Sequence, residues 1–163
     1  MHWSQRATEV GRQTEMIPAK LIPELEQLTR NQVRVIVACA DCKNREVLVS
    51  LLRQRGLDPT PASSLNETKL LLAREETALV MCEASFSDGD FRDLLRVAFQ
   101  NGSRIPVIVC MDFYDPPVYL EAMELGAFDC LACPCHRDGV EWVVGNALKE
   151  ASVAGRALSV GSA

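Results

Sequence analysis

Five short apolar runs, each followed by a segment of helical periodicity, dominate the chain between residues 33 and 152. The runs lie at residues 33–39, 57–62, 78–83, 105–110 and 127–132. This alternation is typical of βαβ units, in which parallel strands form one sheet and helices connect them. The first, third and fourth runs are nearly continuous in Val, Ile, Leu, Met and Ala, as expected for strands buried on both faces. The sequence therefore predicts an α/β domain.

Capping residues mark the helices that should connect these strands. The expected helices cover residues 44–55, 64–74, 88–102, 115–126 and 138–152. Ser64 and Glu67 have the spacing of a capping box, in which each side chain bonds to the backbone of the other residue. Asp88 is the expected start of the third helix, and Asp115 with Pro116 gives the fourth helix an N-cap and a first-turn proline.

The second apolar run differs from the others because it contains Pro59 and Pro61. Proline has no N–H group to donate to a neighbouring strand, so this strand belongs at an edge of the sheet. Five βα units with such a second strand predict a flavodoxin-like parallel sheet of order 2-1-3-4-5, with helices on both faces.

Length, charge and hydropathy limit the class of protein. The 163 residues, 48% of them hydrophobic, suffice for one sizeable core. We expect one domain at 33–152 and a tail at 153–163. The N-terminal extension at 1–32 is expected to be a loose leader, with a short packing or dimerising helix around 21–28 as the other interpretation. The net charge of -5 argues against nucleic acid or an anionic membrane as a partner. No secretory signal or membrane-spanning run is visible, so the expected location is cytoplasmic.

Several segments form a concerted set that is more specific than the fold class. They are residues 34–37 and 44–48, residues 78–83 followed by Ser87-Asp88-Gly89, residues 105–109, residues 121–129, and Pro134. Together they resemble the receiver domain of response regulators, the CheY-like domain, over roughly residues 33–152. The resemblance implies a flavodoxin-like (CheY-like) fold and a role in two-component or phosphorelay signal transduction.

The resemblance also implies a phosphorylation site. At the positions of that site this chain has other residues than the family. In the family, an aspartate after the third strand accepts a phosphoryl group, and a pair of acids holds Mg²⁺. Here the acceptor position is Glu83, and the acidic pair aligns with Cys39 and Ala40, with Asp41 nearby. The family's hydroxyl residue, lysine and switching aromatic align with Met111, Cys133 and Cys130. We therefore expect a pseudo-receiver that needs no Mg²⁺, accepts no phosphoryl group and is not an enzyme.

Glu83 itself has two interpretations. It could be a permanent substitute for the charged acceptor, or a solvated carboxylate at the end of a strand. Charge mimicry acts through a cationic partner, and Cys133 occupies the position of the family's lysine. A conventional phosphorylated regulator is one of two alternative functions; the other, a cysteine-based metal or redox sensor, depends on the cysteines.

The chain contains seven cysteines, an odd number that is unlike the framework of a secreted disulfide-rich domain. Reduced thiols are therefore expected. Cys82 and Cys110 lie inside apolar runs and are interpreted as small buried core residues.

Four other cysteines follow strands. Cys39 and Cys42 form a CxxC after the first strand, and Cys133 and Cys135 form a CxC after the fifth. In the resembled fold these loops lie side by side at the carboxyl edge of the sheet, where ligands bind. Four thiolates there, with His136 as a further ligand type, could hold Zn²⁺ or close a disulfide in a metal or redox sensor. Simple packing, with no cofactor, is the other interpretation.

The expected output of the domain is contact with a protein partner, homodimerisation included. The fourth helix, fifth strand and fifth helix form the expected interaction face. Trp142 lies roughly opposite the inward-facing Val140, given about 100° of rotation per helical residue, so its ring should lie outside the core. Tyr119, Leu120 and Met123 should turn partly outward on the fourth helix. The sequence thus predicts a stand-alone receiver protein that acts by binding.

Overall fold

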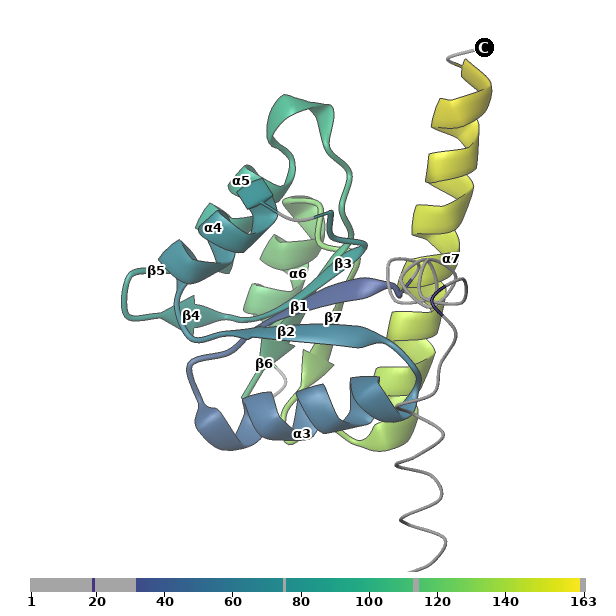
Figure 1. Ribbon diagram of the computed structural model, residues 1–163. Helices are drawn as coiled ribbons and strands as arrows, with labels where there is room; N and C mark the ends of the chain where they lie inside the picture. Colours follow the sequence, from purple (N-terminus) through teal and green to yellow (C-terminus); the bar gives the residue numbers. More distant parts are fainter. Residues whose placement is uncertain (1–18, 20–31, 75, 113–114, 162–163) are drawn as a thin grey trace, which may run out of the picture. The chain divides into compact units, whose positions relative to one another are not determined.

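The computed structural model describes residue 19 and residues 32–74, 76–112 and 115–161, with side chains described for the same residues except 101 and 152–161. The unit that begins at Val33 is built on a five-stranded sheet. Its strands are β1 (Arg34–Ala38), β2 (Asp58–Ala62), β3 (Leu79–Glu83), β6 (Val107–Met111) and β7 (Asp129–Ala132). All neighbouring pairs are parallel, and the order is β2-β1-β3-β6-β7 (Figure 1). The predicted fold class is confirmed.

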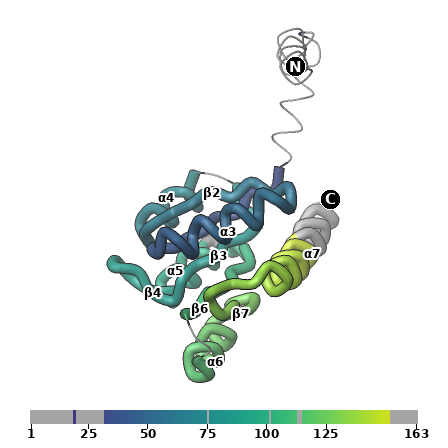
Figure 2. The backbone as a smooth tube through the Cα atoms, turned by 90° about the horizontal axis from the view of Figure 1, so that it is seen from below, coloured from purple at the N-terminus to yellow at the C-terminus, as the bar shows by residue number. Residues whose placement is uncertain are grey.

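Five helices cover the two faces of this sheet. They are α3 (Cys42–Gln54), α4 (Leu65–Arg74), α5 (Phe91–Ala98), α6 (Pro116–Glu124) and α7 (Arg137–Gly161). Helices α3 and α7 pack on one face, and α4, α5 and α6 pack on the other (Figure 1). Figure 2 looks onto the face that α3 and α7 cover.

Alternation along each central strand divides the core into two clusters. In β1, Val35 and Val37 pack toward α3 and α7, while Ile36 and Ala38 pack toward α4, α5 and α6. Both sets are buried, which explains why the central strands are apolar at nearly every position. Full burial of one such aliphatic side chain stabilises the fold by roughly 1.5–3 kcal/mol.

Strand β2 lies at an edge, as its prolines predict. Among the described strands it pairs only with β1, with Pro59 opposite Val35 and Pro61 opposite Val37. At one end of this pairing the N–H of Asp58 donates to the carbonyl of Val33, and at the other end the N–H of Cys39 donates to the carbonyl of Ala62. Both hydrogen bonds are 2.9 Å long. The predicted edge position of β2 is confirmed.

The start of α5 corrects the expectation for Asp88. A short hairpin, β4 (Ser85–Phe86) and β5 (Gly89–Asp90), precedes the helix, and Asp90 is its N-cap in a capping box with Asp93. The carboxylate of Asp88 instead accepts hydrogen bonds from the N–H groups of Leu65 and Asn66, at 3.0 and 2.9 Å. Asp88 thus caps α4, a helix more than twenty residues earlier in the chain.

Helix α7 differs from the expectation at its end. It continues to Gly161 and extends past the sheet, where the sequence predicts a tail from residue 153 (Figure 1). The added segment consists of helix-compatible residues without proline, so nothing in its sequence interrupts the helical hydrogen bonds. The short helix expected around residues 21–28 lies outside the described residues. Within the described part of the chain, no helix combines the length and apolar character needed to cross a bilayer.

Candidate functional site at the carboxyl edge of the sheet

The positions predicted for a phosphorylation site all lie near the carboxyl ends of the strands. Glu83 and Met111 are the last residues of β3 and β6. Cys39, Ala40 and Asp41 follow β1, and Cys133 follows β7. Because parallel strands end at the same edge of a sheet, the fold brings these segments together.

Glu83 is half-buried, and the loop after β1 closes over its carboxylate. Oε2 accepts a 2.8 Å hydrogen bond from the N–H of Ala40, and Oε1 accepts one of 3.3 Å from the N–H of Asp41. The thiol of Cys39 donates to Oε1 over 2.9 Å. The interpretation of Glu83 as a merely solvated carboxylate is therefore wrong, because three protein donors bind it.

The Cys39 thiol suits this role because it keeps its proton. Its burial and its hydrogen bond to the Glu83 carboxylate raise the pKa of Cys39 well above its usual range. A protonated thiol donates to a carboxylate, whereas a thiolate would repel it. The pair therefore combines a neutral donor with a charged acceptor.

Asp41, the acid nearest to Glu83 in the loop, caps a helix. Its Oδ1 accepts a 2.9 Å hydrogen bond from the N–H of Asn44, which makes it the N-cap of α3. The guanidinium of Arg45 reaches back from the first turn of α3 and donates to the carbonyl of Cys39 over 2.7 Å. Ala40, which occupies the other position of the expected acidic pair, is exposed and has no side-chain oxygen.

Met111 and Cys130 contribute apolar surface to the site. Both pack in the cluster beneath α4, α5 and α6, where Met111 is buried and Cys130 half-buried. Burial, followed by the nearby charge of Asp129, raises the pKa of Cys130 to about 11. Neither side chain is ionised near neutral pH.

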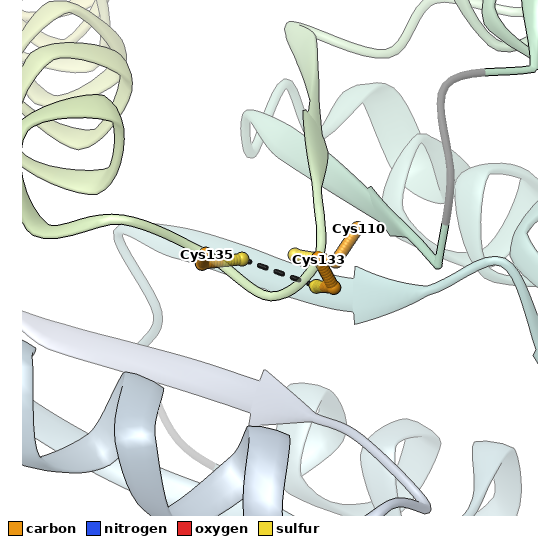
Figure 3. Close-up of side chains that lie close together, drawn as sticks. All are labelled: Cys110, Cys133 and Cys135. Carbon is orange, nitrogen blue, oxygen red and sulfur yellow. Dashed lines mark hydrogen bonds between the residues drawn. The ribbon is translucent and has the colours of Figure 1, made fainter.

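The predicted group of four thiols is corrected by the structure. The thiols of Cys133 and Cys135 lie 3.1 Å apart (Figure 3). Their partner is Cys110, and the three Sγ atoms all lie within 4.8 Å of one another. Cys39 is bound to Glu83, and Cys42 is exposed on α3 with its thiol 3.5 Å from Glu46. Neither belongs to this group, which we call the thiol trio: Cys110, Cys133 and Cys135.

Cys110 is buried, as predicted for a core residue, but it also contacts two thiols that the prediction from the sequence does not group with it. Alternation in β6 puts Cys110 on the same face as Ile108, the face that α3 and α7 cover. The loop carrying Cys133 and Cys135 returns to that face before α7 begins. Strand alternation could therefore have included Cys110 in the group. His136 is exposed and is not part of the trio.

The thiols of the trio perturb one another. Donation from Cys110 and then from Cys135 holds the pKa of Cys133 well below its usual range. The pKa of Cys110 is raised, first because it donates to Cys133 and Cys135 and then because it is buried. For Cys135, a hydrogen bond from Cys110 lowers the pKa. The hydrogen bond of Cys135 to Cys133 and its burial have the larger combined effect, so the pKa of Cys135 is raised. The three thiols therefore form one connected set of hydrogen bonds.

The expected interaction residues differ in exposure. Trp142 is 71% exposed and Leu120 is 59% exposed, while Val140 is only 2% exposed, as predicted for the opposite side of α7. Tyr119 and Met123 are partly buried. Trp142 lines a shallow groove together with Arg55, Asp138, Glu141, Gly145, Asn146 and Lys149. The helices that carry Leu120 and Trp142, α6 and α7, lie on opposite faces of the sheet, with β7 at the edge between them (Figure 1).

The parallel order β2-β1-β3-β6-β7, with two helices on one face and three on the other, is the fold of response-regulator receiver domains. A scan against models of known protein families gives no match. The chain is similar to the response regulator protein PilR of Pseudomonas aeruginosa, with 30% identity over 105 residues. That match covers 64% of this chain and 24% of PilR, so it spans about a quarter of the relative's length.

Solved structures give the same fold. The receiver domain of the Francisella response regulator 1452 matches with a TM-score of 0.68 and 21% identity, covering 73% of this chain and 98% of that one. The chemotaxis response regulator CheY4 of Vibrio cholerae matches with a TM-score of 0.67 and 12% identity, covering 72% and 100%. The beryllofluoride-activated NtrC4 receiver domain dimer matches with a TM-score of 0.68 and 20% identity, covering 72% and 98%.

Proposed function

We propose that this chain is a receiver-type signalling protein of two-component signal transduction that acts by protein–protein contact, without phosphorylation of an aspartate. The receiver class is a signalling module and not an enzyme, in agreement with the expectation from the sequence. The observation that supports the proposal is the set of hydrogen bonds to Glu83. Its carboxylate, at the acceptor position, is bound by the N–H groups of Ala40 and Asp41 and by the thiol of Cys39.

The residues around Glu83 differ in chemistry from those that a Mg²⁺ site needs. Mg²⁺ is bound by oxygen ligands, and phosphoryl transfer needs charge stabilisation. The loop after β1 supplies a thiol at Cys39 and a methyl group at Ala40, while the Asp41 carboxylate caps α3. Cys133 and Met111 supply no ammonium or hydroxyl group at the other positions. This set supports a domain that does not bind Mg²⁺ and does not transfer a phosphoryl group.

The same contacts support a fixed signalling state. Glu83 places a negative charge at the acceptor position, and three donors already hold it. A carboxylate that is held in this way needs no modification to keep its loop ordered. We therefore propose that the domain stays in one conformation and is regulated by partner binding.

We place the contact surface on the exposed apolar side chains of α6 and α7. Leu120 and Trp142 are large and mostly exposed, and Leu125 beside the end of α6 is 45% exposed. Tryptophan is enriched among the residues that dominate binding energies. The similar NtrC4 structure is a dimer, which supports a second copy of this chain as the occupant. The groove beside Trp142 carries the basic residues Arg55 and Lys149 and the acidic residues Asp138 and Glu141. A surface with both signs of charge can be complementary to the same surface on a second copy.

The test is treatment of the purified chain with acetyl phosphate and Mg²⁺, followed by intact mass spectrometry and peptide mapping. We expect no added phosphoryl group, and no Mg²⁺-dependent response to beryllofluoride. A receiver with an intact acidic pair serves as the positive control. A stoichiometric acyl phosphate on Glu83, Asp41 or Asp88 would overturn the proposal and establish a conventional phosphorylated regulator.

A matched variant tests the stated reason. It carries Cys39→Asp, Ala40→Asp, Glu83→Asp, Met111→Thr and Cys133→Lys, which together supply the residues that the family has at these positions. We expect this variant to gain Mg²⁺-dependent phosphorylation, because it has oxygen ligands and a cation around an aspartate. The same variant with Glu83→Asn in place of Glu83→Asp should not gain it.

A further inference from the structure

Three thiols converge at the carboxyl end of β6, on the face that α3 and α7 cover. Their Sγ atoms lie within 4.8 Å of one another, and those of Cys133 and Cys135 are 3.1 Å apart (Figure 3). Three sulfur atoms bound to one ion at about 2.3 Å would lie roughly 3.8–4.0 Å from one another. The trio therefore matches the size of a metal–thiolate site, with adjustments below about 1 Å.

The backbone holds these ligands in place from two directions. Cys110 belongs to a strand that is paired on both sides, with β3 and β7. The N–H of Cys133 donates to the carbonyl of Met111 over 2.6 Å, which extends the β6–β7 pairing into the loop. Cys135 follows one proline later, and α7 begins at Arg137. The ligands therefore stand on the sheet and its first loop turn, so little ordering is needed on binding.

We propose that Cys110, Cys133 and Cys135 form a binding site for one thiophilic metal cation, of the class of Zn²⁺ and Cu⁺. Three thiolates are soft ligands, which select such ions over Mg²⁺ and Ca²⁺. Cu⁺ is satisfied by three sulfur ligands, whereas Zn²⁺ takes a water molecule as the fourth ligand. The site goes beyond the proposed signalling function and does not depend on it.

The apolar surroundings couple ionisation of the thiols to the binding of a cation. Cys110 is 3% exposed and Cys133 is 8% exposed, and both pack in an apolar cluster with Ile108 and Val140. Three thiolates cannot all ionise in such a place unless a cation compensates their charges. Metal–sulfur bonds therefore form as the thiol protons pass to the solvent, and no electron is transferred.

Cys135 is the most exposed ligand of the trio. Cys135 is partly exposed and stands next to the exposed His136. An incoming ion can thus meet Cys135 first and then exchange its remaining water ligands for the two buried thiols. Cys42 is exposed, lies outside the trio and donates a hydrogen bond to Glu46. Its replacement is therefore a control for the loss of one thiol from the same chain.

The experiment is titration of the reduced, metal-free full chain with Co²⁺, followed by displacement with Zn²⁺. We expect one Co²⁺ per chain, with a thiolate-to-cobalt charge-transfer band, and release of protons to the buffer on binding. Cys135→Ser should weaken Co²⁺ binding by roughly tenfold or more, since one of three ligands is lost. Cys42→Ser should bind like the wild type.

Folding is checked in parallel, because Cys110 and Cys133 are buried. Circular dichroism of each metal-free variant shows whether it is folded, and Cys135→Ser alters only the partly exposed ligand. Zn²⁺ should raise the thermal midpoint of the wild type and of Cys42→Ser more than that of Cys135→Ser. The proposal is overturned if the reduced wild type shows no charge-transfer band. It is also overturned if folded Cys135→Ser binds Co²⁺ as tightly as the wild type, or if the only chemistry found is a Cys133–Cys135 disulfide.

Discussion

The thiol of Cys39 donates a 2.9 Å hydrogen bond to the carboxylate of Glu83, across the ends of β1 and β3. The two strands pair in parallel, with Ala38 opposite Cys82, so the next residues along the two chain segments, Cys39 and Glu83, are neighbours. The backbone N–H groups of Ala40 and Asp41 add to the same carboxylate. Glu83 thus links the loop after β1 to the central strand of the sheet.

A double-mutant cycle measures this link. Glu83→Ala should lower the free energy of unfolding by about 1–2 kcal/mol, because it removes a charged acceptor from three donors. Cys39→Ala should cost less, and the coupling energy between the two changes should be about 0.5–1.5 kcal/mol. Urea unfolding of the four proteins, monitored by circular dichroism, gives these values.

The control is a second cycle in which Cys42, and not Cys39, is changed to alanine. Cys42 is exposed and does not touch Glu83, so Cys42→Ala and Glu83→Ala should add within about 0.5 kcal/mol. Equal coupling for both cysteines would contradict the assigned hydrogen bond.

Much of the fold could be predicted from the sequence because burial leaves a strong pattern. Strands covered on both faces are apolar at each position, and Pro59 and Pro61 are compatible only with an edge. The N-cap of α5 could not be assigned in this way, since Asp88 and Asp90 both have the chemistry of an N-cap. The contact of Asp88 with Leu65 and Asn66 is a tertiary one, which local sequence does not encode.

The candidate site was predictable in outline but not in its contacts. Topology placed Glu83 and Cys133 at the same edge of the sheet. The hydrogen bonds of Glu83 depend on the path of the loop after β1, which has no sequence pattern of its own. The grouping of Cys110 with Cys133 and Cys135 depends on the face that each side chain takes. A shift of one residue in either segment would separate them.

Buried thiols should make the protein less stable in alkali. The pKa of Cys130 is raised from 9.0 to about 11, first by burial and then by the charge of Asp129. In the unfolded chain this thiol loses its proton near pH 9, before the folded protein does. Its contribution to stability is therefore complete below about pH 9 and is lost as pH rises toward about 11.

Urea unfolding between pH 7 and 10.5, under reducing conditions, checks this effect. Cys130→Ala should flatten the alkaline decrease, because it removes one of the thiols that ionise more readily in the unfolded state. Leu120→Gln changes an exposed side chain without removing a thiol, so it should leave the slope unchanged. A wild-type stability that rises from pH 8 to 10 would contradict the prediction.

The exposed side chains of α6 and α7 should affect association more than folding. Leu120→Gln and Trp142→Gln remove the two most exposed large apolar side chains among the described residues. Each should change the free energy of unfolding by less than about 1 kcal/mol, as surface substitutions do. Leu48→Ala is the comparison for a core position, where loss of a buried leucine costs roughly 2–5 kcal/mol. Sedimentation velocity over a range of concentrations should show weaker self-association for the Trp142→Gln and Leu120→Gln variants. If both variants stay folded and associate like the wild type, the contact surface lies elsewhere on the domain.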